Sequence, residues 1–165
     1  MKKKRSDKIL EEIHEVLKKL GLPCCQEHMQ GKMFGMGVIF RNLDDFKVSI
    51  GIIIDDENGH ITLSMSPPDK IPEEKIPVVM NVINRINNTS IAEHIWMDCE
   101  TNDVIVMKGI FLVGKTLDKE EFEATVNGLL SSGVVTLKTV LEQAASDEKP
   151  EVLVKRMLEK YSCHT

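Results

Sequence analysis

The sequence has few aromatic residues and carries no marked excess of positive charge. Its 165 residues include one tryptophan, one tyrosine and five phenylalanines, and the formal net charge is -5. So few rings offer few platforms on which the bases of a single strand could stack. A mildly acidic chain also lacks the broad basic face that a phosphate backbone requires. We therefore expect no nucleic-acid partner.

Long apolar stretches and an export signal are also missing. The longest stretch without a polar side chain, residues 33–40, is too short for a helix to cross a bilayer. Residues 2–5 are basic and lead into a charged amphipathic helix, whereas a signal peptide would have an apolar core there. The four cysteines do not resemble a secreted disulfide framework, since two of them are adjacent (Cys24, Cys25, Cys99, Cys163). We predict a cytoplasmic protein with free thiols and no membrane partner.

The apolar periodicity predicts an α+β fold. Helical spacing occurs within residues 6–20 and 72–87, from about residue 118 to 144, and again after Pro150. Alternating residues predict strands over 32–41, 46–54, 61–66, 93–99 and 104–113, with hairpin turns between neighbours. This gives an antiparallel twisted sheet of about five strands flanked by helices, in the order αβββαββα plus a C-terminal helix. We predict a single domain over residues 1–147 and a C-terminal helical extension over 148–165.

One octapeptide matches a nucleotide-binding motif. Gly109–Thr116 fits the phosphate-loop pattern G-x-x-x-x-G-K-[ST], in which Lys115 would reach the phosphates and Thr116 would hold magnesium. However, the inner residues 110–113 are bulky and β-forming, and the helix-capping signal comes only at Asp118. The predicted hairpins also conflict with the parallel sheet that such enzymes need. We interpret the segment as the end of a strand and keep a nucleotide-binding NTPase as the alternative function.

Possible metal-binding groups are equally incomplete. The acidic run 55–57 lacks the glycine and glutamate that an EF-hand calcium loop requires at its sixth and twelfth positions. Cysteines and histidines near the two ends could bind zinc if the ends met, but they lack paired C-x-x-C spacing (Cys24, Cys25, His28, Cys163, His164). The remaining histidines stand in no recognisable nucleophile motif (His14, His60, His94). We therefore predict no catalytic, cofactor-binding or metal-binding residues and no enzyme, and keep a small-ligand or metal sensor as a third hypothesis.

Methionine is comparatively abundant, with nine residues. Most of them follow the apolar periodicity and fit a core. Met29, Met33 and Met36 cluster at the entry to the first predicted strand. Because methionine also lines adaptable binding surfaces, we predict these three as a possible partner-binding surface if they are exposed together.

Several segments resemble the YbjN family of bacterial domains. They are Leu20–Pro23 after the first helix, Ile61–Pro68 leading into Ile71–Lys75, and Val82–Asn87 before the second hairpin. The resemblance extends over about residues 6–145 and implies a fold similar to that of type III secretion chaperones, which are often dimeric. It also implies a regulatory or chaperone-like role and carries no catalytic residue. We predict a non-enzymatic, homodimeric protein-interaction domain of chaperone, adaptor or regulatory character, with a protein or peptide partner.

Overall fold

The chain folds into two compact units. The structure, a computed structural model, describes the backbone of residues 5–22, 26–30, 33–41, 46–55, 57–89, 93–112 and 116–162, and the side chains of residues 8–22, 46–55, 57–89, 93–112 and 116–161. The first unit comprises Met1–Ser64 and Lys108–Asn127, and the second comprises Met65–Met107 and Gly128–Thr165. The single domain over 1–147 with an extension over 148–165 stays a prediction.

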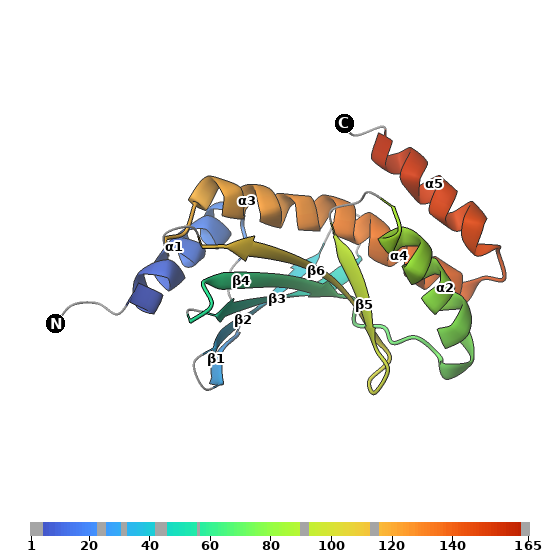
Figure 1. The fold of residues 1–165 in the computed structure, drawn as a ribbon, viewed down its shortest axis with the longest axis horizontal. Coiled ribbons are helices and arrows are strands. Elements are labelled where there is room, and N and C mark those ends of the chain that lie inside the picture. Colours follow the sequence, from blue (N-terminus) through green and yellow to red (C-terminus); the bar gives the residue numbers. More distant parts are fainter. Residues whose placement is uncertain are drawn as a thin grey trace. The chain divides into compact units, whose positions relative to one another are not determined.

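The strands form a six-stranded sheet in the order β1-β2-β3-β4-β6-β5 (Figure 1). The pairs β1–β2, β2–β3 and β5–β6 are antiparallel, and the α+β class is confirmed. The expected count of about five is one strand short, because β1 has the polar sequence QEHMQ and no apolar alternation. The strands are β1 (Gln26–Gln30), β2 (Met33–Arg41), β3 (Lys47–Asp55), β4 (His60–Ser66), β5 (His94–Asp98) and β6 (Asp103–Phe111).

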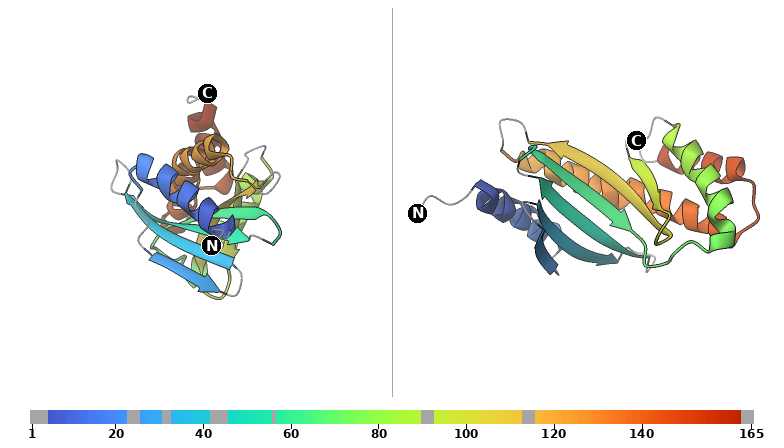
Figure 2. Two further views of the ribbon diagram at one scale, coloured as in Figure 1. Left: turned by 90° about the vertical axis from the view of Figure 1, so that its left-hand side faces the viewer. Right: turned by 60° about the horizontal axis from the view of Figure 1, so that its bottom comes forward.

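The first unit contains two helices, α1 (Arg5–Lys19) and α3 (Lys119–Gly128, of which the last residue belongs to the second unit). It also contains β1–β3, β4 up to Ser64 and the end of β6 (Figure 2). Two exposed ion pairs join the helices: Lys19 Nζ lies 2.7 Å from Glu123 Oε2, and Lys119 Nζ lies 2.6 Å from Glu15 Oε2. The core of this unit contains the apolar stripe of α1, alternate residues of β3 and β4, and two residues of α3 (Ile9, Ile13, Val16, Leu17, Val48, Ile50, Ile52, Ile54, Ile61, Leu63, Phe122, Val126).

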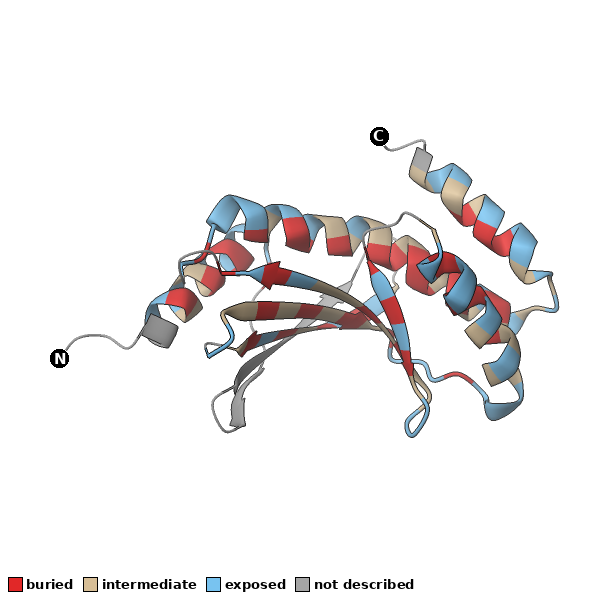
Figure 3. Ribbon diagram, in the orientation of Figure 1, coloured by how far each residue is buried: buried red, intermediate tan, exposed pale blue. Residues whose placement is uncertain are grey.

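The second unit contains the 3-10 turn η1 (Glu73–Lys75) and α2 (Ile76–Asn87), β5 and the first half of β6, a π-helix (Leu129–Gly133), α4 (Val134–Ala145) and α5 (Pro150–Ser162). Pro77 lies in the first turn of α2, where its missing N–H is tolerated. Figure 3 shows buried residues along one side of each of these helices. The long helix predicted from residue 118 consists, in the structure, of three consecutive segments: α3, the π-helix and α4.

This helical run also passes a simple test for membrane spans. Lys119–Ala145 is long and apolar enough to cross a bilayer by length and composition alone, but half of its most apolar window is buried inside the protein. The core helix of a water-soluble protein meets the same criteria, so the finding is weak evidence for a membrane span.

Candidate functional site

The phosphate-loop pattern does not form an anion-binding loop over its described residues. Gly109, Ile110 and Phe111 belong to the extended strand β6, with Ile110 buried and Phe111 74% exposed. Gly109 allows the close approach of His60, since a Cβ at this position would lie 2.6 Å from His60 Nε2. Its role is therefore to leave room for a side chain on β4, and the interpretation as a strand end is confirmed for these residues. Lys115 lies outside the described residues.

The helix that follows does not offer its first N–H groups to a ligand. Asp118 Oδ1 accepts hydrogen bonds from the N–H of Glu120 at 3.0 Å and of Glu121 at 3.1 Å. This side-chain cap confirms the predicted helix start. The adjacent depression, of about 530 Å³, is lined by Phe111 and residues 116–121. Three of these residues are acidic and the cation among them, Lys119, is paired with Glu15, so the surroundings repel a phosphate.

The acidic run after β3 serves a turn. Asp55 Oδ1 accepts the N–H of Asn58 at 3.0 Å, and Asp55 Oδ2 accepts Asn58 Nδ2 at 2.7 Å. These two hydrogen bonds lower the pKa of Asp55 below its ordinary value. Gly59 completes the turn with a φ of 65°. The Asp55 carboxylate thus stabilises the turn between β3 and β4.

The histidines and cysteines considered for chemistry are not brought together in the part of the chain that the structure describes. There, no group of three or more His, Cys, Asp or Glu side chains could hold a metal ion. His60 contacts Phe111, with ring centroids 5.2 Å apart, and its Nδ1 lies 3.2 Å from Thr62 Oγ1. The proposed zinc ligands lie outside the described side chains (Cys24, Cys25, His28, Cys163, His164).

The three methionines at the sheet entry occupy different register positions. Met29 lies opposite Phe34, Met33 opposite Asp55, and Met36 opposite Ile52. Positions 33 and 36 are an odd number of residues apart, so they belong to opposite faces of β2. Their side chains lie outside those described, and the partner-binding surface at Met29, Met33 and Met36 stays a prediction.

A clearer apolar surface lies on the hairpin β5–β6. The register pairs Trp96 with Ile105, and on the same face the neighbouring pairs are His94–Met107 and Asp98–Asp103. This row, hereafter the hairpin face, is opposite to the buried residues of both strands. Trp96 is 49% exposed there. Sequence reasoning overlooked it, although the only tryptophan of the chain alternates with buried Ile95 and Met97, which places it on the other side of β5.

A side chain of α2 occupies the outer edge of β5 at Ile95. Asn87 Nδ2 donates to the carbonyl of Ile95 at 2.9 Å, and Asn87 Oδ1 accepts the N–H of Ile95 at 3.0 Å. The amide thereby imitates a neighbouring strand at the exposed edge of the sheet. A partner strand could not pair with Ile95 without displacing it.

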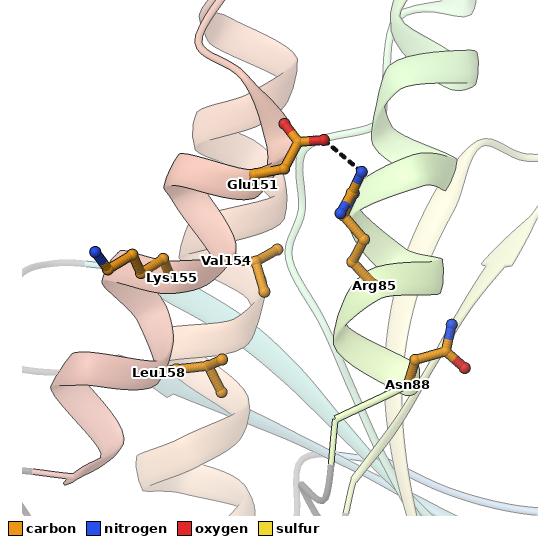
Figure 4. A pocket seen from close by; sticks show the side chains of 6 residues that line it. All are labelled: Arg85, Asn88, Glu151, Val154, Lys155 and Leu158. Carbon is orange, nitrogen blue, oxygen red and sulfur yellow. Dashed lines mark hydrogen bonds and ion pairs between the residues drawn. The ribbon is translucent and has the colours of Figure 1, made fainter.

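A groove lies between α2 and α5 (Figure 4). It measures about 420 Å³ and combines apolar side chains with a charged rim (Arg85, Asn88, Glu151, Val154, Lys155, Leu158). Arg85 forms an ion pair with Glu151 across the groove and donates from Nε to Asn81 Oδ1 at 2.9 Å. One wall of this groove therefore comes from the C-terminal helix.

The far end of α5 is held by a partly buried polar network. The Tyr161 hydroxyl donates to the carbonyl oxygen of Ser132 at 2.6 Å and lies 2.7 Å from Thr136 Oγ1. Ser132 belongs to the π-helix, whose wide turn departs from the regular α-helical ladder. The Ser132 hydroxyl donates a hydrogen bond to the buried carboxylate of Glu93. Burial, together with the charge of Glu93, raises the pKa of Tyr161.

Comparison with known proteins identifies a matching family and a similar solved structure. The YbjN family model, described as "Putative bacterial sensory transduction regulator", matches residues 10–134. No curated protein is similar enough to count as a relative. A chain from "Crystal Structure of the ExsC-ExsE Complex" shares the fold with a TM-score of 0.53 and 17% sequence identity, over 80% of this chain and 92% of that one. The match over most of its length shows that the chain belongs to the YbjN family.

Proposed function

We propose that this protein is a non-enzymatic interaction domain of chaperone, adaptor or regulatory character, which works in the cytoplasm as a homodimer and binds another protein. The observation that carries the proposal is the hairpin face, where exposed Trp96 and half-buried Ile105 form an apolar pair in the middle of a row. Covering the exposed half of Trp96 would remove about 100 Å² from water and contribute about 2.5 kcal/mol. Large exposed side chains of this kind are typical anchors for a partner.

The charges at one end of the hairpin face define the partner's chemistry. Asp98 and Asp103 lie two residues beyond the apolar pair, on the same face, and Glu100 lies in the connecting turn. Lys70 is a nearby cation, 3.9 Å from Asp103, and the acidic groups outnumber it, so this end of the face is negative. A matching partner is an extended segment with an apolar side chain over Trp96 and a basic side chain about 6.6 Å further along.

The occupied edge of β5 at Ile95 indicates which part of the hairpin a partner would contact. Because Asn87 occupies the N–H and the carbonyl of Ile95, a partner would meet the face of the hairpin with its side chains. The likeness to a chain from a two-protein complex supports a protein partner. The family description supports a regulatory role.

The tryptophan offers a direct test, since it is the only one in the chain. Extended peptides in which valine and lysine stand two residues apart, on one face, should shift the Trp96 emission to shorter wavelength, and peptides with glutamate in place of the lysine should leave it unchanged. Added salt should weaken the first effect, because the charges are exposed. Equal responses to both peptides, or none to either, would reject the hairpin face as the binding surface. Sedimentation at micromolar concentration tests the homodimer, and a strict monomer would contradict that part.

A further inference from the structure

The helix α5 is attached with unsatisfied polar atoms near both of its ends. Three buried side-chain atoms lack a hydrogen-bond partner in the part of the chain that the structure describes: Glu93 Oε2, Gln143 Oε1 and Ser146 Oγ. Gln143 and Ser146 lie at the connection that leads into α5, and Glu93 lies in the network around Tyr161 near its other end. Buried polar atoms of this kind are costly wherever they occur.

The connection between α4 and α5 is short. It consists of residues 146–149 and begins with Ser146 in an extended conformation, at φ -129° and ψ 165°. Gln143 Nε2 reaches over it to the carbonyl of Glu148 at 2.9 Å, which leaves Gln143 Oε1 without a donor. Opening this hinge would expose Gln143 Oε1 and Ser146 Oγ to water. It would thereby remove the free-energy cost of burying these two atoms without a hydrogen-bond partner.

The helix α5 packs against α2 and α4. Leu153, Val154 and Met157 are buried. On the rim, Arg156 lies 2.7 Å from both Glu142 Oε1 and Glu148 Oε1, and Arg85 pairs with Glu151. The receiving surface of α2 and α4 is the same in every copy, so α5 from a second copy could make the contacts to these two helices.

We propose that α5 is exchanged between two copies of the chain, each copy receiving the other's helix on α2 and α4. A short hinge with unfavourable features is the usual setting for such an exchange. A second copy is the occupant that this surface fits, because the complement of α5 is already built into it. The proposal deepens the homodimer of the proposed function and rests on it.

A charge exchange at the α4–α5 contact tests the proposal. One full-length variant carries Arg156→Glu and the other carries Glu142→Arg, so that each alone places like charges at this contact. In a mixed dimer with exchanged helices, the carboxylate introduced at position 156 of one copy meets the guanidinium introduced at position 142 of the other, and the second contact keeps its natural pair. Because two contacts change from repulsion to attraction, we expect the mixed dimer to form about tenfold more tightly than either variant alone.

The outcomes separate exchange from other dimers. Preferential mixed dimers in light scattering and native mass spectrometry support the exchange. Mixed dimers at the statistical proportion overturn it and leave a homodimer through another surface. Monomers throughout overturn both the exchange and the homodimer. Circular dichroism establishes that both variants are folded.

A second variant keeps the proposal testable should a charge variant misfold. Ser146→Ala removes a hydroxyl that has no partner, so it should favour the closed hinge and reduce the dimer fraction of the otherwise natural protein several-fold. A dimer fraction that is unchanged or increased would overturn the role of the hinge. Ser131→Ala is the control for a serine-to-alanine change away from the hinge; it removes an exposed hydroxyl that donates to the carbonyl of Gly128 at 3.1 Å.

Discussion

The hydroxyl of Tyr161 is a small group whose removal should have a measurable cost. It donates to the carbonyl of Ser132 at 2.6 Å, and because its one proton is used there, Thr136 Oγ1 at 2.7 Å must be the donor of the second hydrogen bond. Tyr161→Phe removes both bonds and keeps the ring. The carbonyl of Ser132 and the hydroxyl of Thr136, which is buried, then lose a partner.

The expected loss can be worked from these two bonds. Each intramolecular hydrogen bond contributes about 0.5–1.5 kcal/mol net, so Tyr161→Phe should lower the free energy of unfolding by about 1–3 kcal/mol. For a chain of this size, each kcal/mol lowers the melting temperature by about 2–4 °C. The loss should act on the unit that contains α5.

Urea unfolding followed by Trp96 fluorescence measures this loss, because Trp96 and Tyr161 belong to the same unit. Thr136→Val is the matched variant: if the two hydroxyls interact, the double variant should lose less than the sum of the single losses. A loss below about 0.3 kcal/mol in Tyr161→Phe would refute the reasoning, since it lies below the smallest contribution of one hydrogen bond.

Three further predictions concern single groups. Tyr161 is the only tyrosine, so absorbance at 295 nm should show its ionisation above the ordinary pKa of 10.0 in the folded protein and near it in urea. The contribution of the neutral Tyr161 side chain to the free energy of unfolding is then complete below pH 10.0, and it is lost as the pH rises through the pKa of the folded state. A titration midpoint of Tyr161 that is lower in the folded protein than in the unfolded chain would contradict this. Asp118→Ala removes the α3 cap and should cost about 0.5–2 kcal/mol in urea unfolding, whereas no loss would mean that the cap is dispensable. Mg-ATP and Mg-GTP should leave the melting temperature unchanged, and a shift that disappears in Lys115→Ala would restore the nucleotide-binding alternative.

Strong local patterns allowed much of the fold to be predicted from the sequence. Alternation of Ile50, Ile52 and Ile54 with less buried residues identified β3, and Asp118 marked the start of α3. Pro150 marked the start of α5. In each case the signal and the structure it specifies lie within a few residues of one another.

Features that depend on distant contacts were not predictable. β1 is a strand because it pairs with β2, and its polar sequence carries no alternation. The π-helix depends on its surroundings: Gly133 approaches Met65 so closely that a Cβ would lie 2.6 Å from the methionine Cε. The hydrogen bond between Tyr161 and Ser132 joins residues 29 positions apart. Periodicity records burial along one element and says little about such partners.

Site-specific cross-linking in cells tests the central claim most directly. A photoreactive benzoylphenylalanine replaces Trp96 in one protein and Val152 in another; both side chains are exposed and apolar, at 49% and 43%. The account predicts that position 96 captures a protein through a segment that combines apolar and basic residues, that valine–lysine peptides compete with this capture, and that position 152 does not yield the same adduct. Adducts from position 96 that match those from position 152, or that such peptides do not reduce, would contradict it.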